Sequence, residues 1–240
     1  MKNALITGAG RGIGKALAHK FLAEGWRVFG TTQTGTVDYS ADYSSDCMRI
    51  FQLDLDSADS IKSCTKAIDV ELGKAGKEKI SILINNAGIL ADEGETHVVI
   101  GKLRKTLEVN LLGTIDFTEQ IIPMMIGSDK NGSHIVNISS QAGSLAEAEI
   151  LADTHEPYHY PSYKISKAAL NMYTRTLAVR MSHEETNIIV SSIHPGWVRT
   201  AMGGDSAPVT PDKAAEDIFK LAVSSPETGQ FWYKGKRYPW

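Results

Sequence analysis

The chain has 240 residues, of which 42% are hydrophobic and 22% charged, and its formal net charge at neutral pH is -3. This size and composition suit one globular domain, residues 1–240, whose core is large enough to need no disulfide or metal. The 25 Lys and Arg residues are scattered and form no basic stripe. We therefore expect small-molecule partners, and neither a nucleic acid nor a membrane.

Two cysteines, Cys47 and Cys64, occur without a CxxC pair, and the histidines do not cluster at metal-ligand spacing. This pattern argues against a disulfide framework and predicts no metal site. The N-terminal stretch MKNALITGAG lacks the apolar length of an export signal, and no run of about 18 apolar residues occurs elsewhere. We expect a cytoplasmic protein with buried thiols.

Six short apolar runs, rich in β-branched residues, predict strands at residues 4–7, 27–32, 49–53, 80–84, 134–138 and 188–193. The segments between them carry helical spacing, as in Ile13, Leu17 and Phe21, and Ser57 is a candidate N-cap for the helix that follows it. Near-continuous apolar strands that alternate with helices predict a doubly wound, mostly parallel α/β sheet covered on both faces. Such sheets bind ligands at the carboxyl ends of their strands.

The first predicted strand leads into TGAGRGIG, residues 7–14, and then into a helix. Glycines there let backbone amides approach a pyrophosphate, while the helix N-terminus supplies partial positive charge. The spacing is TGxxxGxG, through Gly8, Gly12 and Gly14. A glycine-rich turn without a ligand is the alternative.

Further motifs follow the later strands: NNAG at residues 85–88, a helical Asn110, SSQAG from Ser139, and YKISK at residues 163–167. A Tyr and a Lys four residues apart lie on one helix face, which could equally be an ordinary solvated surface. Together and in this order, the five motifs resemble the short-chain dehydrogenase/reductase superfamily, over nearly the whole chain. HPGWVRTAMGG from His194 and the ending GQFWYKGKRYPW resemble its carbonyl reductase branch, which includes sniffer-like and C-factor-like proteins.

The resemblance implies a Rossmann-like fold and a catalytic tetrad of Asn110, Ser140, Tyr163 and Lys167. Tyr163 would exchange a proton with the substrate oxygen while the nicotinamide exchanges hydride with the adjoining carbon. Lys167 is expected to lower the pKa of the phenol and to hold the nicotinamide ribose. Ser140, rather than Ser139, would hydrogen-bond the reacting oxygen. Asn110 would hold a water that links Lys167 to solvent, or bond to backbone inside its helix.

The resemblance also implies a cofactor-binding set. Asp54 would contact adenine, although it could equally be an acidic residue that precedes a helix. Residues 86–88 would line the adenosine, and HPGWVRT would pass along the nicotinamide, unless it is only a turn after a strand. The expected set is Gly8, Arg11, Gly12, Ile13, Gly14, Thr32, Asp54, Leu55, Asn86, Ala87, Gly88, Tyr163, Lys167, Pro195, Gly196, Val198 and Thr200.

The choice between NADP(H) and NAD(H) depends on the end of the second strand, where an acid would bond the ribose 2′-hydroxyl and repel a 2′-phosphate. Thr31, Thr32 and Gln33 stand there without an acid, and Arg11 adds a cation nearby. We expect NADP(H), although relatives in this branch often carry Arg where Gln33 stands.

Twenty-three positions separate Ser140 from Tyr163, which exceeds the commonest spacing in the family. We interpret residues 145–161 as an insertion that forms a mobile wall of the substrate pocket. Its acidic and histidine residues have no metal-ligand spacing. The family's common interface uses the helices that carry Asn110 and Tyr163, so a homodimer or homotetramer is open, and the insertion could extend or obstruct it.

The function expected is NADP(H)-dependent hydride transfer between the nicotinamide and a carbonyl or alcohol of a small molecule. One alternative is a non-catalytic dinucleotide-sensing or signalling protein on the same fold. The complete tetrad argues against it, because a sensor needs no proton donor. Dehydration or epimerisation through a transient keto form is a further alternative, which the lack of an added substrate domain disfavours.

Overall fold

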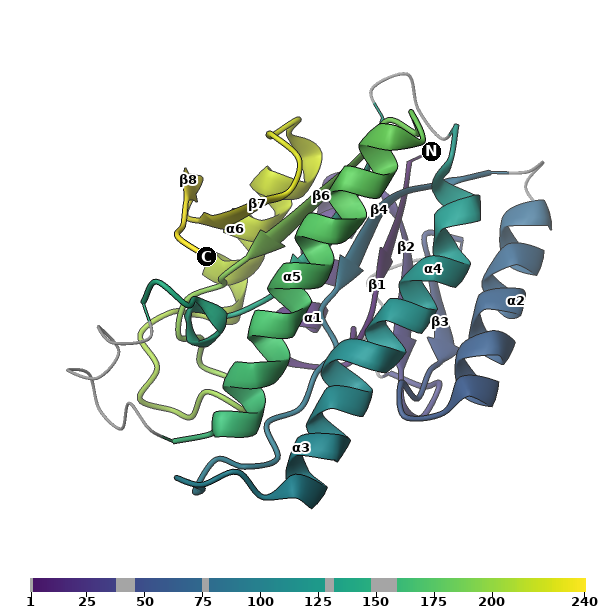
Figure 1. Ribbon diagram of the computed structural model, residues 1–240. Helices are drawn as coiled ribbons and strands as arrows, with labels where there is room; N and C mark the ends of the chain where they lie inside the picture. The colour runs from purple at the N-terminus through teal and green to yellow at the C-terminus, as the bar shows by residue number, and fades with distance from the viewer. Residues whose placement is uncertain (1, 38–45, 75–77, 128–131, 148–158) are drawn as a thin grey trace.

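The computed structural model describes residues 2–37, 46–74, 78–127, 132–147 and 159–240. The strands of this part of the chain form one eight-stranded sheet in the order β3-β2-β1-β4-β5-β6-β7-β8 (Figure 1). Neighbouring strands are parallel, except that β7 and β8 are antiparallel. The strands are β1 (Asn3–Ile6), β2 (Arg27–Thr32), β3 (Met48–Gln52), β4 (Ile80–Asn85), β5 (Ser133–Ile138), β6 (Ile188–Ile193), β7 (Gln230–Tyr233) and β8 (Lys236–Arg237).

Helices cover both faces of the sheet, so the predicted doubly wound fold is confirmed (Figure 1). One face carries α2 (Ala58–Lys74), α4 (Gly113–Met125) and α5 (Pro161–His183). The other face carries α1 (Gly12–Ala23) and α6 (Pro211–Val223). The helix α3 (Ile100–Leu107) runs through a π-helical turn, η1 (Glu108–Leu112), into α4, and a short 3-10 helix, η2 (Gln141–Gly143), follows β5.

The central strands β1 and β4 are mostly apolar because both of their faces are buried. Leu5 packs into the core beneath α2, α4 and α5, whereas its neighbour Ile6 packs into the core beneath α1 and α6. Both side chains are fully buried. Each of these two strands therefore supplies alternate residues to two cores, which removes the polar alternation typical of a half-exposed strand.

Local sequence signals account for several helix starts. Ser57 caps α2 as predicted, since its Oγ accepts a hydrogen bond from the Ser60 N–H at 3.3 Å. Thr210 caps α6 in the same way, through the Lys213 N–H at 3.2 Å. Pro211 opens α6 at a position where its missing N–H costs nothing.

The strands β7 and β8 are absent from the six strands that the sequence predicts. They form a hairpin at one end of the sheet, and β8 pairs with the outer edge of β7. The chain then turns back over β7, where the Trp240 ring stacks on Phe231 with 5.4 Å between ring centroids. Arg175 of α5 lies over the same indole at 5.6 Å. The C-terminal aromatic residues therefore cover a face of β7, while β8 closes its edge.

Both cysteines are free thiols. Cys64 is buried in the core beneath α2, and burial raises the pKa of its thiol to about 12. Cys47 is only partly buried, so the expectation of two buried thiols is correct for Cys64 alone. Cys47 follows the residues that the structure leaves undescribed before β3, and it packs against the core on the α1 side.

Candidate active site

The expected site residues gather at the carboxyl ends of four neighbouring strands. The glycine-rich turn follows β1, the NNAG motif ends β4, Ser139 and Ser140 follow β5, and the HPGWVRT segment follows β6. The strand order reverses between β1 and β4, because the chain passes from β3 at one edge back to β4 on the other side of β1. Ligands of open parallel sheets bind at such a reversal.

Ser140 and Tyr163 meet at this edge of the sheet. Ser140 leaves β5 in an extended conformation, and its Oγ accepts a hydrogen bond from the Ala142 N–H at 3.1 Å. Tyr163 is the third residue of α5, and its side chain is hydrogen-bonded to Ser140. Burial raises the pKa of Tyr163 to about 12, although the bond to Ser140 acts in the opposite direction. The phenol is therefore protonated at neutral pH and can act as a donor.

Lys167 lies one turn further along α5 and is 5% exposed. Its ammonium donates a hydrogen bond to the Ile138 carbonyl at 2.8 Å and lies 5.5 Å from the centroid of the Tyr163 ring. Burial lowers the pKa of Lys167 to about 8. The sequence predicts that Lys167 lowers the pKa of Tyr163, but in the structure that pKa is raised. Burial of the phenol outweighs the opposing hydrogen bond, and the ammonium is bonded to Ile138.

Asn110 is buried in the π-helical turn between α3 and α4. Its side-chain amide bonds to both backbone groups of Ile89, accepting from N–H at 2.8 Å and donating to the carbonyl at 2.9 Å. It also donates to Ser166 of α5 at 3.1 Å. A π-turn inside a helix is frequent at functional sites. Asn110 thus bonds to backbone, as one alternative expects, but the backbone belongs to the segment after NNAG and not to its own helix.

Ser139 and Ser140, the two serines that follow β5, have different hydrogen-bond partners. Ser139 is 2% exposed, and its Oγ donates to Asn171 of α5 at 2.6 Å. Asn171 in turn donates to the Gly143 carbonyl at 3.1 Å. Ser139 therefore joins β5 to α5, and the structure brings Ser140 rather than Ser139 to Tyr163.

The glycine-rich turn packs its backbone closely at the start of α1. Gly8 has a φ of +68°, and a Cβ on Gly14 would lie 2.1 Å from the Gly8 carbonyl oxygen, so a side chain is excluded there. Arg11, the N-cap residue, is exposed and makes no side-chain capping bond. The backbone of this turn can therefore approach a pyrophosphate, and the N–H groups of the first helical turn are free of a side-chain cap.

The other strand-end segments close around this turn. Asn86 donates to the Thr7 carbonyl at 2.9 Å and to the Gly8 carbonyl at 3.3 Å. The Thr200 methyl group lies beside Gly12, where a Cβ would come within 3.1 Å of it. The residues present thus fit a dinucleotide, because a cradle without side chains is enclosed by the segments after β4 and β6.

A sequence model of the family described as short chain dehydrogenase matches residues 2–209. The chain belongs to this family. The NADPH carbonyl reductase 1 of Mus musculus is 28% identical to it, across 99% of this chain and 98% of the relative. The solved structure of NADPH-bound carbonyl reductase from chicken fatty liver has a TM-score of 0.85 at 28% identity and covers 100% of this chain and 94% of its own. The carbonyl reductase Sniffer of D. melanogaster has a TM-score of 0.84 at 27% identity, with 100% of both chains covered.

Asp54 and Leu55, two members of the expected cofactor-binding set, lie in different environments in this short-chain dehydrogenase. Asp54 is partly exposed, and its Oδ1 accepts a hydrogen bond from the Asp56 N–H at 3.1 Å. This leaves a second carboxylate oxygen, so both expectations for Asp54 stay open. Leu55 is 6% exposed and packs into the core beneath α2 and α4. Its side chain is a core residue, so the expected cofactor contact of Leu55 concerns its backbone and stays a prediction.

The remaining members of the expected set border the same site. Ile13 packs against the core on the α1 side. Thr32 ends β2 and donates to the Thr36 carbonyl at 3.2 Å. After β6, Gly196 has a φ of +88°, and Val198 is buried and bridges to Val209. Ala87 and Gly88 lie in the NNAG segment, and Pro195 lies in the HPGWVRT segment.

Sequence reasoning missed three residues that organise the site of this short-chain dehydrogenase. The Thr7 hydroxyl accepts hydrogen bonds from the N–H groups of Asn86 and Ala87, each at 3.0 Å. The Thr that opens TGxxxGxG is a signal that could have found it. Ser166 accepts from Asn110, and Asp92 holds the start of α5. Ser166 lies inside the YKISK motif, between Tyr163 and Lys167, whereas Asp92 lies in none of the predicted motifs.

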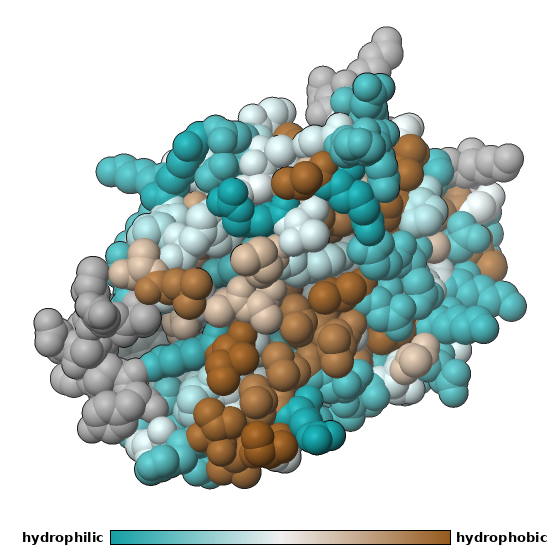
Figure 2. Space-filling model, in the orientation of Figure 1, coloured by the Kyte–Doolittle hydropathy of each residue, from teal (hydrophilic) through white to brown (hydrophobic). Residues whose placement is uncertain are grey.

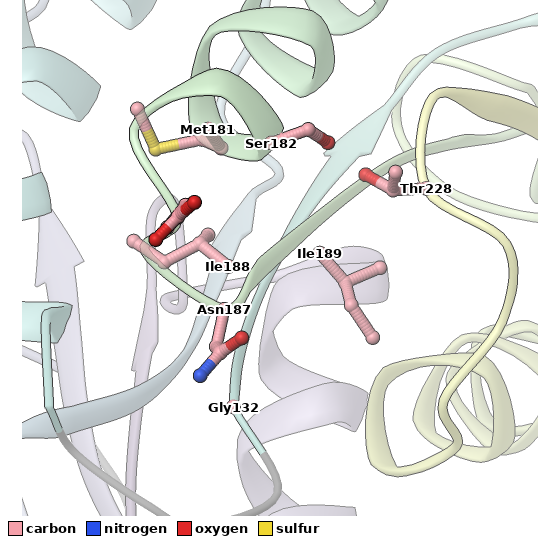
Figure 3. Close-up of a pocket in the computed structure, with 8 residues that line it drawn as sticks. Gly132, Met181, Ser182, Asn187, Ile188, Ile189 and Thr228 are labelled. Carbon is pink, nitrogen blue, oxygen red and sulfur yellow. The ribbon is translucent and has the colours of Figure 1, made fainter.

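A hollow of about 700 Å³ lies at the opposite end of the sheet (Figure 3). Met181, near the end of α5, lines it together with Asn187 and Ile188 at the start of β6, whereas Tyr163 stands at the beginning of α5. The hollow is therefore distinct from the candidate active site. Thr228, which also lines the hollow, accepts a hydrogen bond from the Val190 N–H and so contributes to the packing of β6.

Two kinds of feature are absent from the described part of the chain. Within it, no helix is long and apolar enough to cross a membrane. No group of three or more His, Cys, Asp or Glu side chains in the same residues could hold a metal ion. Most of the acidic and histidine residues of the expected insertion fall in 148–158, outside the described residues.

Proposed function

We propose that this short-chain dehydrogenase is an NADP(H)-dependent oxidoreductase that reduces the carbonyl group of a small molecule, or oxidises the corresponding alcohol. The observation that carries the proposal is the hydrogen bond between Ser140 and Tyr163, located beside a glycine-rich turn that fits a dinucleotide. When bound, the cofactor supplies or accepts the hydride. The residues of the chain supply orientation and the proton.

In the reducing direction, Ser140 donates a hydrogen bond to the substrate carbonyl oxygen and holds it against Tyr163. Tyr163 then transfers its phenolic proton to that oxygen as negative charge develops on it. The raised pKa of Tyr163, about 12, supports this direction, because the phenol is protonated before substrate arrives. The reverse reaction needs the phenolate, which burial disfavours at neutral pH.

Lys167 and Asn110 have supporting roles in this step, in holding the cofactor and in supplying protons. We propose that the Lys167 ammonium holds the nicotinamide ribose and that Asn110 places a water between Lys167 and solvent. Both side chains lie beside Gly88, where a Cβ would be 3.1 Å from Asn110 Oδ1 and 3.7 Å from Lys167 Nζ. A proton lost from Tyr163 can be replaced along such a route.

The preference for NADP(H) rests on charge at the end of β2. Thr31, Thr32 and Gln33 offer no carboxylate to repel a 2′-phosphate, and Arg11 is exposed in the nearby glycine-rich turn. Two of the similar proteins are NADPH carbonyl reductases by name. In this proposal Asp54 contacts the adenine.

Titration with both cofactors, followed by a panel of aldehydes, ketones and alcohols read by the absorbance of reduced nicotinamide, tests the proposal. We expect tighter binding of NADPH than of NADH, and turnover of carbonyl compounds. Thr32→Asp should reverse the cofactor preference, since it places a carboxylate against the 2′-phosphate. Asn187→Asp, which adds the same charge at the far end of the sheet, should not.

Two results would reject the proposal. Equal or tighter binding of NADH would contradict the cofactor preference. Dinucleotide binding without turnover of any compound in the panel would favour the alternative of a sensing or signalling protein.

We propose that residues 1–240 form one domain and that residues 145–161 are an insertion at the wall of the substrate pocket. Residues 148–158 lie outside the described residues, but both ends of the insertion border the site. Ala146 stands six residues after Ser140, and Tyr160 packs edge-to-face on Tyr163 at 6.2 Å between ring centroids. A cytoplasmic location is part of the proposal and is supported by the free thiols.

We also propose that the protein forms a homodimer or homotetramer through the outer face of α5. Exposed apolar side chains recur along this helix at Ile165, Met172 and Val179, and Leu112 is exposed on the neighbouring π-helical turn. Figure 2 shows apolar side chains gathered over the face that carries α4 and α5. An exposed patch of apolar side chains is typical of a protein–protein interface.

A further inference from the structure

The helix α5 begins without a capping side chain of its own. Its N-cap residue, Tyr160, makes no side-chain capping bond, and Pro161 has no N–H group. The first N–H group of the helix therefore belongs to Ser162, which is completely buried and cannot reach water. A buried N–H without a partner would cost free energy comparable to a lost hydrogen bond.

Asp92 supplies the missing acceptor from a distant part of the chain. Its Oδ2 accepts a hydrogen bond from the Ser162 N–H at 2.6 Å, across 70 positions of sequence. Asp92 stands in the segment between β4 and α3, four residues after Gly88, and is 1% exposed. A carboxylate at a helix N-terminus is stabilised by the partial positive charge there.

The placement of this carboxylate is costly. Its other oxygen, Oδ1, is buried and has no hydrogen-bond partner among the described residues. Burying an incompletely paired carboxylate opposes folding. A side chain that only filled space at this position could be apolar, so the cost points to a use for the acceptor.

A second bond joins the same two segments. The Tyr160 N–H donates to the Glu95 carbonyl at 2.9 Å, three residues after Asp92. Tyr160 itself has a φ of 49° and a ψ of 52°, a left-handed conformation that is rare for an aromatic residue. The start of α5 is thus held in a strained turn by contacts from the segment between β4 and α3.

We infer that Asp92 is a positioning residue for Tyr163. Tyr163 directly follows Ser162 in the first turn of α5, where a helix opens most readily. By fixing Ser162, Asp92 holds the proton donor within hydrogen-bond reach of Ser140. The inference rests on the proposed function for its kinetic consequence, but its structural consequence can be measured without turnover.

The test compares Asp92→Ala with Asp92→Asn. Alanine removes the acceptor, whereas asparagine keeps an oxygen at the same position. For Asp92→Ala we expect kcat to fall by about 10- to 100-fold, because a small misplacement of a reacting group costs about that much. KM and the NADPH dissociation constant should stay within about threefold, since the hydrogen bond of Asp92 is made to the start of α5 and not to the glycine-rich turn. Asp92→Asn should keep kcat within about threefold of the parent.

Thr210→Ala is the matched control, because it removes the cap of α6, which carries none of the proposed catalytic residues. It should lower the melting temperature as Asp92→Ala does, but leave kcat unchanged. Equal loss of kcat in the two variants would mean that Asp92 acts through stability alone and would overturn the inference. So would a kcat of Asp92→Ala within threefold of the parent.

Hydrogen exchange of a peptide that covers the first turn of α5 gives a readout independent of catalysis. Asp92→Ala should raise exchange there and not in α1 or α6, even if the parent protein shows no turnover. Unchanged exchange would overturn the inference whatever the activity. If Asp92→Ala does not fold, Asp92→Asn decides alone: parent-like exchange and kcat support the acceptor role, and loss of either contradicts it.

Discussion

Tyr163 and Lys167 share one face of α5, but burial moves their pKa values in opposite directions. The pKa of Tyr163 rises to about 12, and the pKa of Lys167 falls to about 8. In both cases burial penalises the charged form. The phenol therefore keeps its proton at neutral pH, while the ammonium is stabilised by the Ile138 carbonyl. This is the resting state that a proton donor for carbonyl reduction requires.

Tyr163→Phe should lower turnover by about 10² to 10⁴-fold, the usual contribution of a positioned acid-base group, while fold and NADPH binding are retained. Only the hydroxyl is removed, and the ring still packs. Tyr173→Phe is the matched control on the same helix, since its hydroxyl donates to Glu119 and should not affect turnover. Steady-state kinetics check both. A Tyr163→Phe variant with more than about a tenth of the parent rate would contradict the assignment.

Lys167→Ala should weaken NADPH binding as well as turnover, because it removes the proposed ribose contact together with a buried charge. The two measurements are the NADPH dissociation constant and kcat. If Lys167 were only an ordinary buried side chain with no role toward the cofactor, the variant would lose stability but bind NADPH like the parent.

Glu71 of α2 contributes to stability in a pH-dependent way. Hydrogen bonds from Lys74 and Arg49 lower its pKa from 4.5 to about 2, and Arg27 also bonds it at 2.7 Å. Because the pKa is lower in the folded state, the stabilisation is complete above the unfolded pKa and is lost as the pH falls from about 4 toward 2. Glu71→Gln should cost about 2 kcal/mol at pH 7. Urea unfolding should show that this difference shrinks at pH 2.5, and a constant difference would contradict the argument.

At the scale of elements, the C-terminal segment joins β7 to the residues that follow Ser140. The Ser144 hydroxyl donates to the Pro239 carbonyl at 3.0 Å, and the Ala146 N–H donates to the main-chain oxygen of Trp240 at 2.8 Å. The stacking of Trp240 on Phe231 anchors this contact. The segment thus holds the first residues of the proposed pocket wall.

Trp240→Ala should therefore raise the KM for carbonyl substrates several-fold and leave the NADPH dissociation constant unchanged. Residues 144 and 146 would lose their anchored partner, while the glycine-rich turn is untouched. Trp26→Ala is the matched control, because Trp26 packs against Phe21 on the opposite face of the sheet. It should reduce stability without changing KM. The same KM for Trp240→Ala and the parent would contradict this role.

At the scale of the whole molecule, the exposed apolar side chains of α5 predict self-association. Met172 is 65% exposed and Val179 is 71% exposed, and a second copy of the chain could bury both. Met172→Glu should shift a dimer or tetramer to monomer, because it places a charge in the interface. Val70→Glu is the control, since Val70 is exposed on α2 at a distance along the sheet. Light scattering during size-exclusion chromatography measures the mass, and a monomeric parent would contradict the prediction.

Much of this protein is determined by signals that lie close together in sequence. Apolar runs predicted six strands because most of these strands are buried on both faces, and Ser57 predicted the start of α2 because a cap acts over three residues. The family motifs predicted which strand ends carry the site. Their roles follow from residue type, and most of these residues do gather at one edge of the sheet.

The tertiary structure alone decided the features that depend on distant segments. The strand β7 and the two-residue β8 are too short and mixed in composition to be predicted, and pairing with β6 makes β7 a strand. The bond from Ser162 to Asp92 spans 70 positions and has no local signal. The pKa of Tyr163 is raised where the spacing to Lys167 predicted it lowered. Spacing along a helix specifies which side chains are neighbours, whereas a pKa depends on how completely the rest of the chain excludes water from them.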